Sequence, residues 1–259
     1  MNLPSNMTLA SSRVIALCGG GGKTSLMLAL AAAFAAQGEK VLVTTTTRMA
    51  VDEMADLPAS AEVVDASGVG ALAGHSRTPV MAYHHVDAVS GKVIGYPPAT
   101  IDQLSAMGVF DRVLVEADGS ARRPLKAPAS HEPVFPASVD AVVMVAGASG
   151  LGRPLDDQSV FRAGLWSRRT GVAIGDTVTP ESLAAMVVHP QGLAQGAPQG
   201  VRRVLFVNQC DEVADLAAAM RVIASLRERV ATPPHCAVLG RLKPDTQVLH
   251  RTCFEELAE

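Results

Sequence analysis

The residues with the clearest chemical purpose are four consecutive glycines followed by lysine, threonine and serine. They follow an apolar stretch at residues 14–17 and open a long Ala/Leu segment, so we expect a strand, a loop and a helix. Glycine lets backbone N–H groups approach phosphate oxygens without a Cβ atom in the way, and the start of a helix adds the positive end of its dipole. The run therefore predicts a nucleotide-binding phosphate loop made of Gly19, Gly20, Gly21, Gly22, Lys23, Thr24 and Ser25.

Lys23 and Thr24 give this loop its expected chemistry. The Lys23 ammonium would neutralise the β- and γ-phosphates, and the Thr24 hydroxyl is placed to hold a magnesium ion. The usual pattern has a glycine six residues before the lysine, where this chain has Leu17, so we expect a shortened or differently wound loop. A dinucleotide site is disfavoured, because the glycine spacing fails and the second strand ends in threonines, with no acid for a ribose hydroxyl.

Two acids end a predicted strand at residues 112–116 and resemble a Walker B element. Glu116 and Asp118 lie two residues apart, so both could project to the same side of an extended strand. One carboxylate can bind Mg²⁺ directly or through water, and the other can orient a water or a substrate hydroxyl toward the γ-phosphate. We expect Asp118 at the metal and Glu116 as its neighbour or as the base, with the order of the roles left open. Together with Lys23 they form the predicted catalytic set.

Three cations follow these acids at Arg122, Arg123 and Lys126. Arginine forms bidentate bonds with phosphate and always keeps its charge, so these side chains could hold a transferred phosphate or an anionic substrate. The alternative is that they are solvated, or that they pair with Glu116 and Asp118.

The second predicted strand ends in four threonines and an arginine, residues 44–48. Thr46, Thr47 and Arg48 lie furthest along this run and are candidates for substrate contacts. Threonine is also a good strand former, so some of these hydroxyls are expected to have only a structural role.

Asn208 and Asp211 follow a later strand in a pattern that resembles the guanine-reading Asn-Lys-x-Asp of GTP-binding proteins. Asp211 could accept hydrogen bonds from a guanine edge while Asn208 supports the loop. Gln209 stands where that pattern has lysine, so the choice between ATP and GTP stays open. Asp211 could equally be the N-cap of the helix predicted to run to Val230.

The elements that must position these residues alternate between strand and helix. Short, Val-rich, continuous apolar runs are typical of strands covered on both faces, and they occur at residues 13–18, 40–45, 112–116, 141–146, 203–208 and 237–239. Helix-like stretches occupy residues 24–37, 100–107, 180–187 and 211–230. We predict an α/β fold with a doubly wound, mostly parallel sheet of P-loop NTPase type, in which the carboxyl ends of the strands bring the motifs into one site.

A single domain over residues 1–259 is expected, with a β-hairpin insert at about residues 65–98. Within the insert, extended pieces at residues 80–84 and 92–96 flank a polar turn. Residues 188–200 are rich in Gly, Pro and Gln and predict a mobile surface loop.

Composition narrows the class of protein further. Apolar residues make up 48% of the chain and the formal net charge is −3, so overall charge gives no reason to expect nucleic acid or a membrane as partner. The four cysteines are scattered without a metal-ligand spacing or a disulfide framework, which favours a cytoplasmic location. The apolar segment at residues 26–36 is too short to cross a bilayer.

Several motifs taken together resemble the YqeC family. They are the glycine loop, the run at residues 41–49, the long segment at residues 115–128 with the following residues 131–133, the pieces at residues 152–157 and 160–162, and the Asn208 motif. Members of that family are described as accessory proteins of selenium-dependent molybdenum hydroxylases. The resemblance implies a nucleotide-dependent role in maturing a molybdenum- or selenium-containing cofactor, with a molybdenum hydroxylase or another maturation protein as partner.

Three functions are compatible with these residues. The leading hypothesis is an Mg²⁺-dependent nucleoside triphosphatase or phosphotransferase that uses ATP or GTP to assist that maturation. The second is a small-molecule kinase in which Arg122, Arg123 and Lys126 hold the acceptor. The third is a chaperone that binds the nucleotide without hydrolysing it and uses it as a conformational switch.

Overall fold

A computed structural model describes residues 3–50, 62–65, 72, 79–229 and 233–254 of the chain. Within them, nine strands form one central sheet, and all neighbouring strands are parallel except β13 and β14. From one edge to the other the strands are β14 (Gln247–Cys253), β13 (Cys236–Arg241), β12 (Arg202–Asn208), β10 (Ala141–Gly147), β1 (Val14–Gly19), β8 (Arg112–Glu116), β2 (Val41–Thr45), β5 (Val80–Tyr83) and β4 (Glu62–Asp65).

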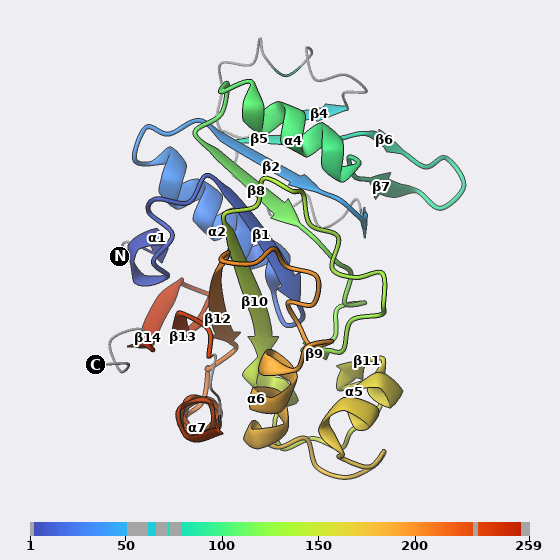
Figure 1. Cartoon of the computed structure of the whole chain (residues 1–259), viewed down its shortest axis with the longest axis vertical. Coiled ribbons are helices and arrows are strands. Elements are labelled where there is room, and N and C mark those ends of the chain that lie inside the picture. Colours follow the sequence, from blue (N-terminus) through green and yellow to red (C-terminus); the bar gives the residue numbers. More distant parts are fainter. Residues whose placement is uncertain (1–2, 51–61, 66–71, 73–78, 230–232, 255–259) are drawn as a thin grey trace.

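Helices cover both faces of this sheet (Figure 1). The helices α1 (Leu3–Asn6) and α2 (Lys23–Ala35) share one apolar cluster with alternate residues of the strands. A second cluster, on the other face, includes side chains of α4 (Pro98–Ala106), α5 (Ala163–Thr170), α6 (Pro180–Val188) and α7 (Val213–Arg229). The two clusters explain why the strand sequences are continuously apolar, since a strand between two helical layers must be apolar on both of its faces.

The phosphate-loop strand β1 lies near the middle of the sheet, between β8 and β10. The chain builds β2, β5 and β4 on the β8 side of β1, and later builds β10, β12 and β13 on its other side. The direction of strand addition therefore reverses next to β1, and in open α/β sheets ligands bind at such a point, outside the carboxyl ends of the strands. The predicted doubly wound, mostly parallel α/β sheet is confirmed.

The strands that form the hairpin are not the ones that were predicted. The run at residues 80–84 was expected to pair with residues 92–96, but β5 pairs with β2 and β4 in the main sheet, because Val80, Met81 and Ala82 are buried there. The hairpin arms are instead β6 (His85–Val86) and β7 (Lys92–Ile94), and β3 (Arg48–Ala50) completes a separate three-stranded sheet. Other parts of the 65–98 segment lie outside the described residues.

Residues 188–200 are anchored to the fold, so the prediction of a mobile loop is wrong. Leu193 is buried, and the Gln195 side-chain amide donates to the backbone oxygens of Ala129 and Glu132. A composition rich in Gly, Pro and Gln does not reveal one apolar anchor or one buried amide. The segment thereby supports the chain that follows β9 (Leu125–Lys126), which pairs with β11 (Val160–Phe161) in a small parallel sheet.

The glycine at the end of β1 is required by the close approach of β10. Gly19 has φ +103°, and a Cβ atom there would lie 2.1 Å from the backbone oxygen of Val145. Gly38 also has positive φ, +84°, but a Cβ atom there would meet nothing within 4 Å. We expect Gly19→Ala to lower the free energy of unfolding by about 3 kcal/mol or more, and Gly38→Ala by only about 1 kcal/mol, because only the first adds a clash to the backbone strain. Urea denaturation of both variants checks this, and equal losses would contradict the account.

Candidate phosphate-binding site

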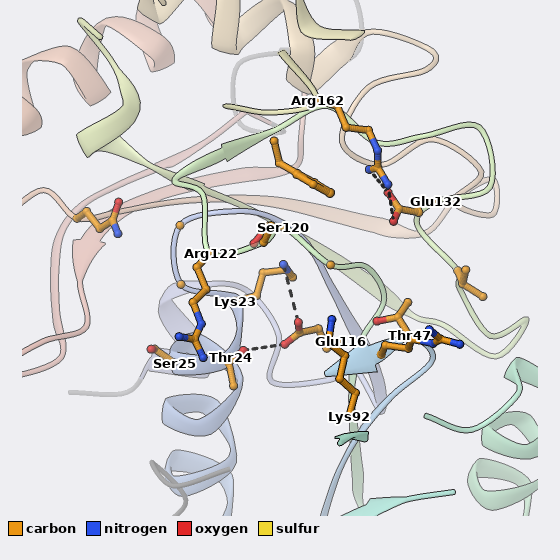
Figure 2. Close-up of a pocket in the computed structure, with 18 of the residues that line it drawn as sticks. Lys23, Thr24, Ser25, Thr47, Lys92, Glu116, Ser120, Arg122, Glu132 and Arg162 are labelled. Carbon is orange, nitrogen blue, oxygen red and sulfur yellow. Dashed lines mark hydrogen bonds and ion pairs between the residues drawn. The ribbon is translucent and has the colours of Figure 1, made fainter. Parts of the chain in front are cut away.

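A large cavity opens at the carboxyl edge of the sheet, over the start of α2 (Figure 2). Its volume is about 990 Å³, which is enough for a nucleotide and a further group. The residues that line it include two glutamates, Glu116 and Glu132, and six cations: Lys23, Arg48, Lys92, Arg122, Arg162 and Lys243. A chain with a small negative net charge thus concentrates positive charge in one hollow, and such a hollow attracts an anion.

The glycine loop uses several of its backbone N–H groups inside the protein. Gly19 N–H donates to the Asp118 carboxylate at 3.1 Å, Gly20 N–H to Val145 O at 2.9 Å, and Gly21 N–H to Arg123 O at 3.0 Å. Gly19, Gly20 and Gly21 were expected among the nucleotide-binding residues, but their amides donate to acceptors within the protein. The amides at the start of α2, residues 22–25, precede the first i→i−4 bond of the helix, from Leu26 to Gly22, and these residues line the cavity.

The missing first glycine is explained by the length of β1. The strand continues through Gly19, and Leu17 is fully buried within it, so the loop is short, as predicted. Gly22 then sits at φ +113° as the residue before α2, where a Cβ atom would lie 2.4 Å from Nδ2 of Asn208. The loop is therefore wound tightly against the end of β12.

Lys23 is held in place by acceptors on three sides. Its Nζ donates to Gly19 O at 2.8 Å and lies 3.4 Å from Oδ1 of Asp118 and 3.9 Å from Oε1 of Glu116. Burial disfavours the ammonium charge, but the attraction of Asp118 and Glu116 outweighs burial and raises the pKa of Lys23. Lys23 therefore remains a cation beside the amides that start α2.

The two acids at the end of β8, Glu116 in the strand and Asp118 just after it, have different surroundings. Glu116 lines the cavity, and its Oε2 accepts a hydrogen bond from the Thr24 hydroxyl at 2.9 Å (Figure 2). Asp118 is 1% exposed, and its carboxylate binds Gly19 N–H, Lys23 and, at 2.9 Å, the Nζ of Lys126. The structure thus places Glu116 next to the predicted metal ligand Thr24 and buries Asp118 beneath the loop, whereas the sequence had suggested Asp118 for the metal.

Lys126 is a buried connector between two carboxylates. Besides Asp118, its Nζ contacts Oε2 of Glu132 at 2.8 Å and donates to Gly119 O, and its side chain is 0% exposed. Glu132 also accepts from Arg162, at 2.5 Å and 3.2 Å. Burial alone would raise the pKa of Glu132, but the hydrogen bonds and charges of Arg162 and Lys126 lower it to about 2. An unbroken chain of charges therefore runs from Lys23 to Arg162.

The remaining predicted substrate residues are only partly brought together. Arg122 lines the cavity next to the start of α2 (Figure 2), but the Arg123 Nε donates to Asp157 O at 2.5 Å and Lys126 is enclosed by its carboxylates. The expected clamp of three cations thus has one member, Arg122, at the cavity. The alternative of pairing with Asp118 is correct for Lys126.

Only some residues of the threonine run at residues 44–48 line the cavity. Thr47 and Arg48 line the cavity. Thr46 does not, since its hydroxyl donates to Val134 O at 2.8 Å, and the Thr45 hydroxyl donates to Glu116 O at 2.9 Å. The hydroxyls of Thr45 and Thr46 therefore fix backbone oxygens within the protein, and only Thr47 and Arg48 of this run face the cavity.

Asn208 supports the phosphate loop directly, because its Nδ2 donates to Gly21 O at 2.8 Å. Asp211 is exposed and is not among the cavity-lining residues, whereas Gln209 is. Asp211 does not cap α7 either: the helix begins at Val213, and the Asp215 carboxylate accepts from Glu212 N–H at 3.2 Å.

Several lining residues carried no recognisable motif. Lys92 and Lys243 reach the cavity from the hairpin and from the β13–β14 connection, and the importance of Glu132 and Arg162 lies in their pairing. The one sequence signal for the last two was their place in the segments that resemble the YqeC family.

The donor set at Thr24 and Glu116 fits a magnesium ion. Mg²⁺ in nucleotide sites takes one or two protein oxygens together with phosphate oxygens and water, and a hydroxyl and a carboxylate lie side by side here. No cluster of three or more His, Cys, Asp or Glu that could hold a metal by itself occurs among the described residues. In the same part of the chain, no helix has both the length and the apolarity needed to cross a membrane.

A parallel α/β sheet with a glycine loop, Lys23 and Thr24 between β1 and α2 defines a P-loop NTPase fold. The YqeC protein family model matches residues 15–164, and the chain belongs to this family. A curated relative, the uncharacterized protein YqeC of Escherichia coli (strain K12), is 37% identical over 218 residues, which cover 83% of each protein. A solved structure of FtsY from Mycoplasma mycoides is 13% identical, with a TM-score of 0.42, and the match covers 92% of this chain and 64% of that one, less than two thirds of its length.

Removing the charge of Asp118 should strongly destabilise the folded protein. Asp118→Asn leaves Lys23 and Lys126 close together without the carboxylate that separates them, so we expect it to lower the free energy of unfolding by about 3–5 kcal/mol. Asp102→Asn is the control, because Asp102 also accepts hydrogen bonds from backbone N–H groups, those of Ala137 and Ser138, but does not pair with a buried lysine. We expect this control to lower the free energy of unfolding by only about 1 kcal/mol. Equal losses in guanidinium denaturation would show that the Asp118 charge is unimportant.

The Glu132 carboxylate should make the stability of the fold depend on pH. Its pKa in the folded protein, about 2, lies below its ordinary value of 4.5, so its ionised form stabilises the fold above about pH 5, and this contribution is lost as the pH falls toward 2. We expect the stability difference between wild type and Glu132→Gln to be largest above pH 5 and to shrink toward pH 2. Denaturation at a series of pH values measures it, and a difference that does not vary with pH would contradict the assignment.

Proposed function

We propose that this protein binds a magnesium nucleoside triphosphate, ATP or GTP, in the cavity over α2 and cleaves or transfers its γ-phosphate. The observation that carries the proposal is the cluster at the start of α2. A buried ammonium, a hydroxyl bonded to a carboxylate, and a free helix N-terminus meet there in a cationic cavity. Each of these groups recognises one part of a magnesium-bound phosphate chain.

The proposed roles follow from the contacts. Lys23 and the amides of residues 22–25 hold the phosphate oxygens and stabilise the charge that develops on them in the transition state. Thr24 and Glu116 would hold Mg²⁺, which when bound neutralises charge on the β- and γ-phosphates. Asp118 keeps Lys23 charged and in position, so we assign it a positioning role in place of the metal role first expected.

The base of the nucleotide would extend toward the ends of β12 and β13. Asn208 already binds the loop at Gly21, and Gln209 and Lys243 line the cavity on that side. Gln209 accepts a hydrogen bond from the Ser149 hydroxyl at 2.6 Å, which holds its side chain beside the end of β10. Asp211 would have to turn toward the cavity to read a base, so ATP and GTP are both to be tested.

The biological role we propose is assistance in maturing a selenium-dependent molybdenum hydroxylase or its cofactor, in the cytoplasm and without nucleic acid or membrane as partner. Its support is the resemblance to the YqeC family and the membership of this chain in that family. A kinase for a small molecule is the second candidate, favoured by the size of the cavity and by cations beyond those that a phosphate chain needs.

The test is calorimetric titration of ATP and GTP with Mg²⁺ into wild type, Lys23→Ala and Lys40→Ala. Lys40 is an exposed lysine outside the cavity, so its variant is the matched control. We expect Lys23→Ala to bind the preferred nucleotide at least about tenfold more weakly, as the loss of one charge-assisted contact implies, while Lys40→Ala binds like wild type.

Because Lys23 is buried, its variant must first be shown to be folded, and Thr24→Ala provides a second variant that should raise the Mg²⁺ concentration needed for binding. Unchanged affinity in a folded Lys23→Ala would overturn the proposal. Phosphate release, measured with and without a molybdenum hydroxylase, then separates an enzyme from a switch: tight binding without turnover in both cases would support the non-hydrolysing chaperone.

A further inference from the structure

The three-stranded sheet β3–β7–β6 has two faces with opposite character. Met49 pairs with Val93 across β3 and β7, and both are buried in the apolar cluster on the α2 face of the main sheet. Arg48 pairs with Ile94, and Lys92 lies two residues before Ile94 on β7, so Arg48 and Lys92 project from the other face. Both are exposed, and both line the cavity.

The position of these cations in the strand order separates them from the proposed nucleotide. The phosphate chain would lie at the start of α2, next to β1, and the base would extend past β10 toward β12 and β13. Thr47 and Arg48 follow the end of β2, which lies beyond β8 on the opposite side of β1, and Lys92 is on β7, which pairs with β3. A nucleotide bound in this way leaves that part of the cavity vacant.

Glu116 lies at the boundary between the two parts. It is the last residue of β8, which lies between β1 and β2, and its side chain accepts a hydrogen bond from the Thr24 hydroxyl on the phosphate side. In the view of Figure 2, Thr47 and Lys92 lie on the side of Glu116 away from Arg122, and all four residues line the same cavity. A group bound by Thr47, Arg48 and Lys92 would therefore lie next to the end of the phosphate chain.

We infer that this part of the cavity is the site of a second substrate, a small molecule that carries a phosphate-type dianion. Two cations from one face of a small sheet and a threonine hydroxyl match a doubly charged oxyanion better than a single carboxylate. Asp87, in the hairpin turn, adds a weak attraction to Arg48 but is not among the lining residues, so the net charge of this wall is positive. In this proposal the hairpin strand β7 and the neighbouring strand β3 supply the cationic residues that bind the second substrate.

The inference rests on the proposed function and specifies its chemistry. An oxygen of the second substrate would attack the γ-phosphorus, the bond from that phosphorus to the β–γ bridging oxygen would break, and the nucleoside diphosphate would leave with the electron pair. The proton of the attacking hydroxyl would pass to water in the cavity, since Glu116 is one of the two residues proposed to hold Mg²⁺.

The test is a second titration. Protein is first saturated with Mg²⁺ and a non-hydrolysable triphosphate analogue, which reports on the proposed function alone. Inorganic phosphate, and acetate in a parallel run, are then titrated into this complex by calorimetry. We expect one phosphate per chain to bind wild type, acetate to bind at least tenfold more weakly, and the Arg48→Ala/Lys92→Ala variant to lose phosphate binding at least tenfold while keeping its affinity for the analogue within about threefold.

The control removes one lysine and one arginine elsewhere, Lys40→Ala/Arg227→Ala, both of them exposed residues outside the cavity lining. It should bind phosphate like wild type. If the analogue binds but phosphate does not, or if phosphate binds the Arg48/Lys92 variant as well as wild type, the second-substrate site is overturned and the nucleotide site stands. If the analogue itself does not bind, the proposed function fails, and this inference fails with it.

Discussion

The site depends on one buried carboxylate that holds two lysines. Asp118 accepts from Gly19 N–H, contacts Lys23 at the phosphate loop and contacts Lys126 on β9. Buried ion pairs of this kind contribute little net stability compared with an apolar core, but a buried lysine without its partner is strongly unfavourable. The arrangement therefore fixes where Lys23 points, and it ties the glycine loop to a segment more than 90 residues later in the chain.

The same carboxylate makes the loop after β8 part of the phosphate site. The backbone oxygen of Arg123 accepts from Gly21 N–H, and that of Pro124 accepts from Gly147 N–H at 2.8 Å, so the segment passes between the glycine loop and the end of β10. Glycines are needed where these backbones meet: a Cβ atom on Gly21 would lie 2.3 Å from Gly147 N. The shortened loop is thus packed against protein on one side, and the side that faces the cavity is the start of α2.

How much of the site could be predicted from sequence depends on how local each feature is. The glycine loop, Lys23 and Thr24 were found correctly as a strand-loop-helix unit, because glycine spacing and apolar periodicity act over a few residues. The hairpin pairing and the anchored segment at residues 188–200 were not, because β5 and Leu193 were drawn into buried positions by partners remote in sequence. Lys92 and Lys243 had no motif at all, since only the folding of two connections brings them to the cavity.

The sequence by itself determined the fold class, the strand that carries the phosphate loop, and the membership of the family, because apolar runs of the right length and glycines before a helix allow few other structures. The tertiary structure alone decided which carboxylate faces Thr24. Glu116 and Asp118 are two residues apart on one chain and equivalent in type, but β8 lies directly beside β1, and the turn after it carries Asp118 beneath the loop to two lysines. The order of the strands across the sheet and the need to pair buried charges determine which carboxylate faces Thr24. Neither can be deduced from a short stretch of sequence, because both depend on residues that are distant in the chain.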